Sequence, residues 1–318
     1  MADPMQPDDN AQGMACLALQ DQVCDEAAKS RDRKGGRGGA AKSGGTGQRR
    51  DVQVSRALSR LLRHQADTAG INLDGEGFAP LDKVLAWGPL RSLNVTLADV
   101  QSVVATNEKQ RFSLKLNPET ARPDASTAAD YLVRANQGHS IKLASSSMLE
   151  PVTLDNVPPR VLHGTYFVFW PAIEAAGGLK PMGRNHVHCS AGDASDSAEG
   201  ELAVVSGMRR DAELVVEIDV EASLRQGVKW WRSDNGVVLT EGSEDGGLLS
   251  ASFFKKVTGR KMNVGVLWED GEKRADLPAG IKGRVPQGKG QGRSRGRGGG
   301  DRRRGGRGRG QDGRQDDE

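Results

Sequence analysis

The segment between residues 160 and 189 constrains the fold most strongly, because it compresses an apolar run, a helix signal and an alternating strand into a short span. The apolar run ends in His163-Gly164-Thr165. A helix is predicted over Trp170–Ala176, with a proline suited to its first turn and a glycine pair suited to its end. The strand that follows carries His186 and His188, which share one face because side chains alternate along a strand.

Three of the five histidines lie in this segment, which leaves three interpretations open. They form a catalytic or binding site, they are metal ligands, or they are core histidines whose rings bond to backbone carbonyls. A metal centre needs a third ligand beside His186 and His188, which His163 or Cys189 could supply. This interpretation is disfavoured because no carboxylate has a useful spacing and Cys189 points to the opposite face of the strand.

The two ends of the chain differ in composition from its middle. Residues 1–28 contain six acidic and no basic residues, and the basic, Gly-rich residues 29–50 complete a leader. Residues 282–318 repeat Gly-Arg units and have almost no apolar side chains. We expect the leader, 1–50, and this tail to be disordered, because they can bury too little apolar surface to fold. Their arginines could bind RNA phosphates and stack on bases, or the tails could serve solubility or nuclear targeting.

Whole-chain features predict an intracellular protein without a membrane anchor. Three cysteines, two of them in the polar leader, cannot build a disulfide framework, and they indicate a reducing compartment, cytoplasmic or nuclear. No apolar run approaches the roughly 20 residues of a membrane span. The acidic N-terminus lacks the basic and apolar regions of a secretory signal. The 318 residues suffice for one large domain or two small ones. We also expect the protein to be a monomer.

Residues 51–140 show the element order of a winged helix, a shape that commonly handles nucleic acid, although fold alone does not define function. Leucines at helical spacing and an apolar stripe that begins at a Thr96 N-cap indicate helices, and an alternating run indicates a two-stranded wing. The expected helices and strands cover, in order, 54–64, Leu81–Trp87, Thr96–Thr106, Arg111–Leu116 and Tyr131–Val133.

Residues 141–281 are predicted to form a small, mostly antiparallel α+β domain. Short apolar runs are separated by Gly and Asp clusters, notably Asp234-Asn235-Gly236, which is a strong turn signal. The expected strands cover Arg160–Tyr166, Val187–Cys189, Leu202–Val205, Leu214–Asp219, Trp230–Trp231, Val237–Thr240, Phe253–Val257 and Val264–Trp268. The fold class predicted for the whole chain is therefore α+β.

Five separated blocks carry a resemblance to a known family. They are Leu61-Leu62-Arg63-His64, Arg134-Ala135-Asn136-Gln137-Gly138-His139-Ser140, His163-Gly164-Thr165-Tyr166, Arg184-Asn185-His186-Val187-His188 and Ser206-Gly207-Met208-Arg209, with a weaker match at 233–240. In this order they resemble the KptA-type RNA 2'-phosphotransferases, distant relatives of the ADP-ribosyltransferases. The resemblance covers residues 51 to about 258 and implies an RNA-binding lobe followed by an ADP-ribosyltransferase-like, NAD-binding lobe.

The resemblance implies a two-step reaction with NAD as co-substrate and no metal. The internal 2'-phosphate of an RNA, as a splicing ligase leaves it on tRNA, attacks a ribose carbon of NAD and expels nicotinamide. The neighbouring ribose hydroxyl then attacks the phosphorus, which releases mature RNA and ADP-ribose 1'',2''-cyclic phosphate.

The same resemblance implies residue roles. Guanidinium groups suit a 2'-phosphate because they hold phosphoryl oxygens in bidentate geometry, and a histidine is the natural general acid for the departing RNA oxygen. The implied catalytic residues are Arg63, His64, Arg134 and Arg209. The implied NAD contacts are His163, Gly164, Thr165, Arg184 and His186 or His188.

Two other functions remain open at this point. An ADP-ribosyltransferase acting on terminal phosphates of nucleic acid or on protein would need the NAD blocks but not Arg63 and His64. A non-catalytic RNA-binding protein would tolerate mutation of His163 or Arg134. Singly, Arg63 and His64 are also explained as cations at a helix C-terminus, and residues such as His139 as partners of turn backbone groups.

Overall fold

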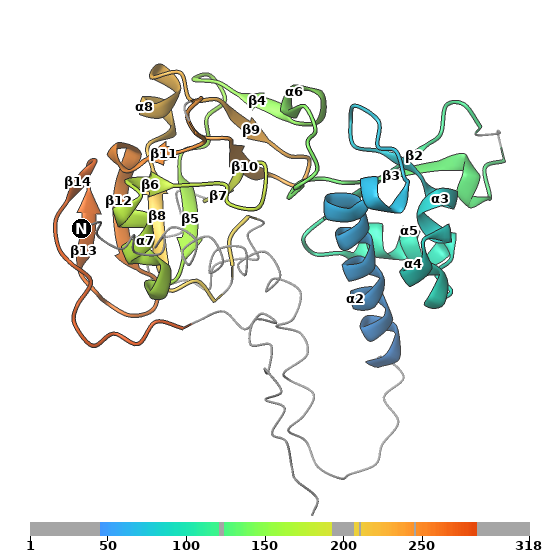
Figure 1. Ribbon diagram of the computed structural model, residues 1–318, viewed down its shortest axis with the longest axis horizontal. Helices are drawn as coiled ribbons and strands as arrows, with labels where there is room; N and C mark the ends of the chain where they lie inside the picture. The colour runs from blue at the N-terminus through green and yellow to red at the C-terminus, as the bar shows by residue number, and fades with distance from the viewer. Residues whose placement is uncertain (1–44, 121–123, 193–206, 210, 245, 285–318) are drawn as a thin grey trace, which may run out of the picture.

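The computed structural model describes residues 45–120, 124–192, 207–209, 211–244 and 246–284. The expectations for the leader up to residue 44, for the strand Leu202–Val205 and for the tail from residue 285 lie outside these residues. The described chain forms a helical lobe and a sheet lobe, at the right and left of Figure 1. Helices and antiparallel strands together confirm the α+β class.

The helical lobe contains the predicted helices and wing strands, together with elements that the sequence did not indicate. Its helices are α2 (Gly45–Arg60), α3 (Leu81–Ala86), α4 (Gly88–Ser92) and α5 (Leu97–Thr106). Its antiparallel sheet has the order β1 (Ala79–Pro80), β3 (Tyr131–Ala135), β2 (Phe112–Leu116). Thr96 caps α5 as expected, because its side chain accepts from Asp99 N and its own N–H donates to the Asp99 carboxylate. The description of this lobe as winged-helix-like stays a prediction.

The sheet lobe is built on one nine-stranded antiparallel sheet. Its strands, from one edge to the other, are β14 (Glu272–Lys273), β13 (Val266–Glu269), β12 (Phe254–Gly259), β8 (Leu214–Ile218), β5 (Val161–Thr165), β7 (Val187–Ala191), β10 (Val237–Thr240), β9 (Trp230–Arg232) and β4 (Glu150–Val152). A two-stranded sheet pairs β6 (Gly178–Leu179) with β11 (Leu249–Ser250). The helices are α6 (Ser145–Met148), α7 (Trp170–Ala175) and α8 (Val220–Arg225). Short 3-10 turns are η4 (Asp67–Ala69) and η5 (Ala128–Asp130) in the helical lobe, and η6 (Phe167–Phe169) and η7 (Ala251–Phe253) in the sheet lobe.

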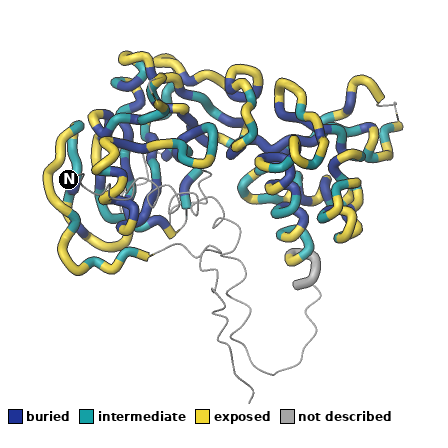
Figure 2. Tube along the Cα trace, viewed as in Figure 1, coloured by how far each residue is buried: buried dark blue, intermediate teal, exposed yellow. Residues whose placement is uncertain are grey.

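Each lobe has its own apolar core, visible as dark segments in Figure 2. In the sheet lobe, Trp170 at the start of α7 packs against Phe254 and Trp268, with ring centroids 6.5 Å and 6.2 Å away. Val187 and Cys189 of β7 belong to this core, so His188 between them faces the other side of the strand. The predicted alternation around the histidines is therefore confirmed, and it points the His188 ring away from the apolar core.

Polar contacts, in addition to the connecting chain, join the two lobes. The turn between β9 and β10, predicted from Asp234-Asn235-Gly236, touches the helical lobe: Asn235 Nδ2 donates to Lys109 O at 2.8 Å. On a second path, Asn185 N donates to His139 O at 2.9 Å. These contacts hold Asn235 and Asn185 of the sheet lobe against Lys109 and His139 of the helical lobe.

Candidate active site

Arg63 and His64 lie in an unusual helical turn. Helix α2 runs into a turn of π-helix, Leu61–Gln65, which buries Leu61 and Leu62 in the core of the helical lobe. A π-turn is rare and occurs frequently at functional sites. The last carbonyls of a helix lack donors within the helix, and here Arg63 O accepts from Ser140 N at 3.0 Å. The two residues do lie at a helix C-terminus, where cations are favoured.

The loop after β3 holds this turn in place. Gly138 has φ +88°, and a Cβ there would lie 3.4 Å from the Arg63 guanidinium carbon, so Arg63 packs directly on the glycine. The His64 ring bonds to Ser140 through Nδ1 and Oγ at 2.9 Å. Two of the sequence blocks, which are about 70 residues apart, therefore form one structural unit.

His139 is a candidate site residue that belongs to one of the five blocks but had no role implied for it, and its alternative explanation was a partner of turn backbone. Its side chain is buried, with 2% of its surface exposed. Among the described residues, neither ring nitrogen has a hydrogen-bond partner. Burial first, and then the charges of groups that include Arg63 and Arg134, lower its pKa to about 3. A neutral imidazole with two unused nitrogens beside two arginines is suited to bind a ligand.

The block 184–188 approaches His139 from the sheet lobe. Asn185 bonds to the loop at both ends, with its N–H on His139 O and its Nδ2 on Ile141 O at 2.7 Å. His186 bonds through Nε2 to Ser145 Oγ at 2.9 Å, and Glu241 lies 3.5 Å from the same nitrogen. Burial lowers the pKa of His186, and Glu241 opposes that shift.

His188 and His163 follow in a chain of contacts to backbone carbonyls. His188 Nδ1 bonds to His186 O, and His163 Nδ1 bonds to His188 O, each at 2.9 Å. Since a carbonyl only accepts, each Nδ1 carries the proton and each Nε2 is left as an acceptor. Burial lowers the pKa of both rings. The core-histidine interpretation is therefore correct for Nδ1, while His188 Nε2 is buried without a partner among the described residues.

Arg209 lies beside His163, because two glycines allow its segment to cross the sheet closely. A Cβ on Gly164 would lie 2.5 Å from Met208 Cγ, and a Cβ on Gly207 would lie 2.4 Å from Cys189 O. The Arg209 guanidinium donates to Tyr166 Oη at 3.3 Å and lies 5.6 Å from the ring centroid of the same tyrosine. Tyr166 in turn donates to Asp211 at 2.8 Å. The charge of Arg209 contributes to the lowered pKa of His163.

The predicted site residues thus fall into two connected groups. The first group contains Arg63, His64 and Arg134. Burial, and then the charges of Arg184 and Arg63, lower the pKa of His64 to about 4. Arg134 belongs to this group because its charge, like that of Arg63, contributes to the lowered pKa of His139. The second group is His163 with Arg209, linked to the first through the contact between His163 and His188 O. Gly164 and Thr165 follow His163 on β5, and Thr165 Oγ1 is buried with no partner in the described chain.

A polar pocket borders His64. Its volume is ≈ 560 Å³, and its lining includes Asn72, Ser140 and Lys142. In the part of the chain that the structure describes, no group of three His, Cys, Asp or Glu side chains could hold a metal ion. No helix in the same residues is long and apolar enough to cross a bilayer.

Comparison with known proteins gives this arrangement a family. Residues 49–242 match the model of the RNA 2'-phosphotransferase, Tpt1 / KptA family. The chain belongs to that family. It is similar to tRNA 2'-phosphotransferase 1 of Homo sapiens, with 41% identity over 209 residues that cover 66% of this chain and 76% of the human one. Other relatives are tRNA 2'-phosphotransferase 1 of Danio rerio, 37% identical over 70% of this chain and 91% of the fish protein, and tRNA 2'-phosphotransferase of Saccharomyces cerevisiae, 37% identical over 60% and 79%.

Family membership confirms the resemblance inferred from the five blocks and makes the chain a transferase of the RNA 2'-phosphotransferase class. The matched range contains Arg63, Arg134 and Arg209, from three separate parts of the chain. Because the family and the relatives are named as phosphotransferases, the interpretation as a non-catalytic RNA-binding protein is set aside.

Proposed function

We propose that this RNA 2'-phosphotransferase removes the internal 2'-phosphate of ligated tRNA by transferring it to NAD, giving mature RNA, nicotinamide and ADP-ribose 1'',2''-cyclic phosphate. The observation that carries the proposal is the meeting of Arg63, His64 and Arg134 around the buried, unpartnered ring of His139. A 2'-phosphate beside a phosphodiester concentrates negative charge, and two guanidinium groups at a water-poor position suit it.

The arginines would act by stabilising charge. Arg63 and Arg134 are each only 9% exposed, so their interactions with a phosphoryl group are weakly screened by solvent. Donors fixed before the reaction stabilise the charge that develops during transfer, and removing one costs roughly 3 kcal/mol, or 10²- to 10³-fold in rate. Arg209, held by the hydroxyl of Tyr166, would serve the reacting group from the side of His163.

His64 would protonate the departing RNA 2'-oxygen. In the free protein its pKa of about 4 keeps the ring neutral at pH 7. A bound phosphate dianion adds a negative charge beside Arg63 and Arg184, which offsets their effect and raises the pKa of His64. The acid form would therefore be available with substrate in place. The adjoining pocket leaves room for the RNA on this side of the ring.

The residues from β5 to β7 fit NAD as co-substrate. NAD supplies the acceptor ribose and a leaving nicotinamide. Thr165 Oγ1 and His188 Nε2 are buried polar atoms without partners in the described chain, as expected where a polar ligand completes the hydrogen bonding. His163 and the backbone of Gly164 would hold the nicotinamide ribose, and Arg184 with His186 would contact the remainder. No metal ligand set is needed for these roles.

The lobes divide the work in this proposal. The helical lobe, 51–140, would bind RNA as a winged-helix-like module, and the sheet lobe, 141–281, would bind NAD as an ADP-ribosyltransferase-like module. Binding would occur in a monomer, in the cytoplasm or the nucleus.

The test mixes the purified full chain, NAD and an oligonucleotide that carries one internal 2'-phosphate. We expect loss of the phosphate only when NAD is present, with one nicotinamide released per phosphate. Arg63→Ala should slow the transfer at least 10²-fold. Absence of phosphate loss at saturating NAD would refute the proposal. Transfer of ADP-ribose to terminal phosphates or protein, without loss of the 2'-phosphate, would favour the ADP-ribosyltransferase alternative.

A further inference from the structure

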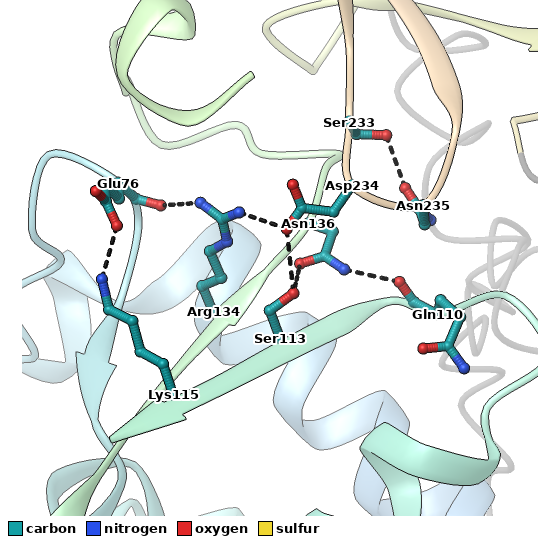
Figure 3. A network of polar contacts seen from close by, with 9 residues as sticks. All are labelled: Glu76, Gln110, Ser113, Lys115, Arg134, Asn136, Ser233, Asp234 and Asn235. Atoms are coloured by element: carbon teal, nitrogen blue, oxygen red, sulfur yellow. Dashed lines mark hydrogen bonds and ion pairs between the residues drawn. The ribbon is translucent and has the colours of Figure 1, made fainter. Parts of the chain in front are cut away.

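The turn between β9 and β10 reaches across to the helical lobe and touches Arg134 (Figure 3). Asp234 Oδ2 accepts from Arg134 Nη2 at 2.5 Å. The turn is itself rigid: Ser233 Oγ donates to Asn235 Oδ1 at 2.7 Å, and Gly236, with φ +76°, donates its N–H to Ser233 O. A carboxylate from the sheet lobe is therefore presented on a fixed backbone to an arginine of the helical lobe.

Arg134 is held at both ends of its guanidinium fork. Nη1 donates to Glu76 O at 3.1 Å, and Nη2 donates to Asp234. The guanidinium carbon lies over the Phe78 ring, 4.7 Å from its centroid. Lys115 covers the same ring at 3.9 Å. The bonds from both Nη atoms and the contact with the Phe78 ring restrict rotation of the guanidinium group.

This clamp leaves the Nε donor of Arg134 for a ligand. Nε of Arg134 is buried and has no hydrogen-bond partner among the described residues. The charge of Arg134 also contributes to the lowered pKa of His139, so the guanidinium lies near that ring. Asp234 lies further out, with its side chain 49% exposed against 11% for Arg134. The carboxylate therefore supports the arginine from the solvent side and does not fill the interior position.

A second tier of contacts fixes Asp234 relative to the strands beneath it. Ser113 Oγ, on β2 opposite Arg134, lies 3.3 Å from Asp234 Oδ2 and 2.7 Å from Asn136 Oδ1. Asn136 Nδ2 donates to Gln110 O at 2.9 Å. With the bond from Asn235 to Lys109 O, these contacts seat the turn on the β2 and β3 strands. The orientation of Arg134 consequently depends on how the two lobes meet.

We propose that Asp234 is a positioning residue, which reaches from the sheet lobe to orient Arg134 for the RNA 2'-phosphate and makes that orientation conditional on the correct seating of the two lobes. The inference rests on the proposed function and deepens it, because it assigns part of phosphate recognition to a residue that does not touch the phosphate. Neutralising Asp234 replaces the charge-assisted bond at Nη2 by, at most, a weaker neutral one, so the fork is held less firmly.

The experiment compares Asp234→Asn with the full-length wild type in the transfer assay. We expect kcat for 2'-phosphate transfer to fall about tenfold, as loss of one charge-assisted hydrogen bond implies, while KM for NAD stays within twofold. Asp234→Glu, which keeps the charge, should recover part of the loss. Glu150→Gln is the matched control, since it removes an exposed carboxylate–arginine pair with Arg232 on the same lobe. It should change kcat by less than twofold.

A double mutant separates positioning from a structural effect. In an Arg134→Ala background, Asp234→Asn should cause no further loss, because Asp234 acts through that arginine. Additive losses, an unchanged rate in Asp234→Asn, or a faster rate showing that the carboxylate competes with phosphate would each overturn the inference. If the wild type itself transfers no phosphate, the proposed function fails. Asp234 is then judged by binding without NAD, where Asp234→Asn should reduce the preference for 2'-phosphorylated over 2'-hydroxyl RNA about tenfold, and an unchanged preference would overturn the inference.

Discussion

Replacing His139 by glutamine should make the protein less sensitive to acid. In the folded protein, burial and neighbouring cations hold the pKa of His139 at about 3, whereas an unfolded histidine has a pKa of about 6.5. The unfolded chain therefore binds more protons in the window between these values. Stability is fully present above pH 6.5 and is lost as the pH falls through the window.

The magnitude follows from the two pKa values. Between pH 7 and about pH 4.5, proton uptake by unfolded His139 lowers the free energy of unfolding by roughly 2.5 kcal/mol. The shift can be converted without discount for solvent screening because the side chain is 2% exposed. His139→Gln removes this contribution and leaves those of the other histidines, so the variant should lose roughly 2.5 kcal/mol less than the wild type over the same range.

The assay is urea unfolding followed by fluorescence at the two pH values. Leu143→Ala is the control, since its side chain lies close to Gly77 in the same region and cannot titrate. It should change the free energy of unfolding equally at both pH values. Equal acid sensitivity in His139→Gln and the wild type would show that His139 is not held neutral, and would refute its assignment as a buried, ligand-ready imidazole.

Three further predictions concern other residues of the site. His64→Ala should slow the second step more than the first, so that ADP-ribosylated RNA accumulates, as gel or mass analysis of the RNA would detect; its absence with slow turnover would remove the general-acid role. Gly164→Ala should cost about 1–3 kcal/mol of stability, measured by denaturant unfolding, because its Cβ would lie 2.5 Å from Met208 Cγ. The same variant should also lower the transfer rate by displacing Arg209. Cys189, whose pKa is raised by burial, should resist alkylation in the native protein and react after unfolding, as peptide mapping would show.

The elements of the fold were largely predictable because their signals are local. Thr96 as an N-cap, the alternation around His188 and the turn at Asp234 each depend on a few neighbouring residues, and each agrees with the structure. The helix α4 was missed, because a five-residue helix starting at Gly88-Pro89 gives no periodic pattern. The partners of the strands, in contrast, are set by packing across the sheet.

The site was only partly predictable, because its features arise between distant segments. The resemblance supplied Arg63 and Arg134 by position, but no local pattern indicates a π-turn at Leu61–Gln65 or a carboxylate reaching from the other lobe. His139 was interpreted as a turn residue because no local pattern indicates its burial or its backbone contact with Asn185 of the sheet lobe. The roles implied for the individual residues stay predictions until they are tested by mutation.

The central claim is tested most directly by following the phosphorus atom. An RNA with a radiolabelled internal 2'-phosphate is incubated with the full-length protein and NAD, and the products are separated. The account predicts that the label leaves the RNA and appears in ADP-ribose 1'',2''-cyclic phosphate, with a 2'-hydroxyl left at the junction. Label released as inorganic phosphate, or retained on the RNA, would contradict it.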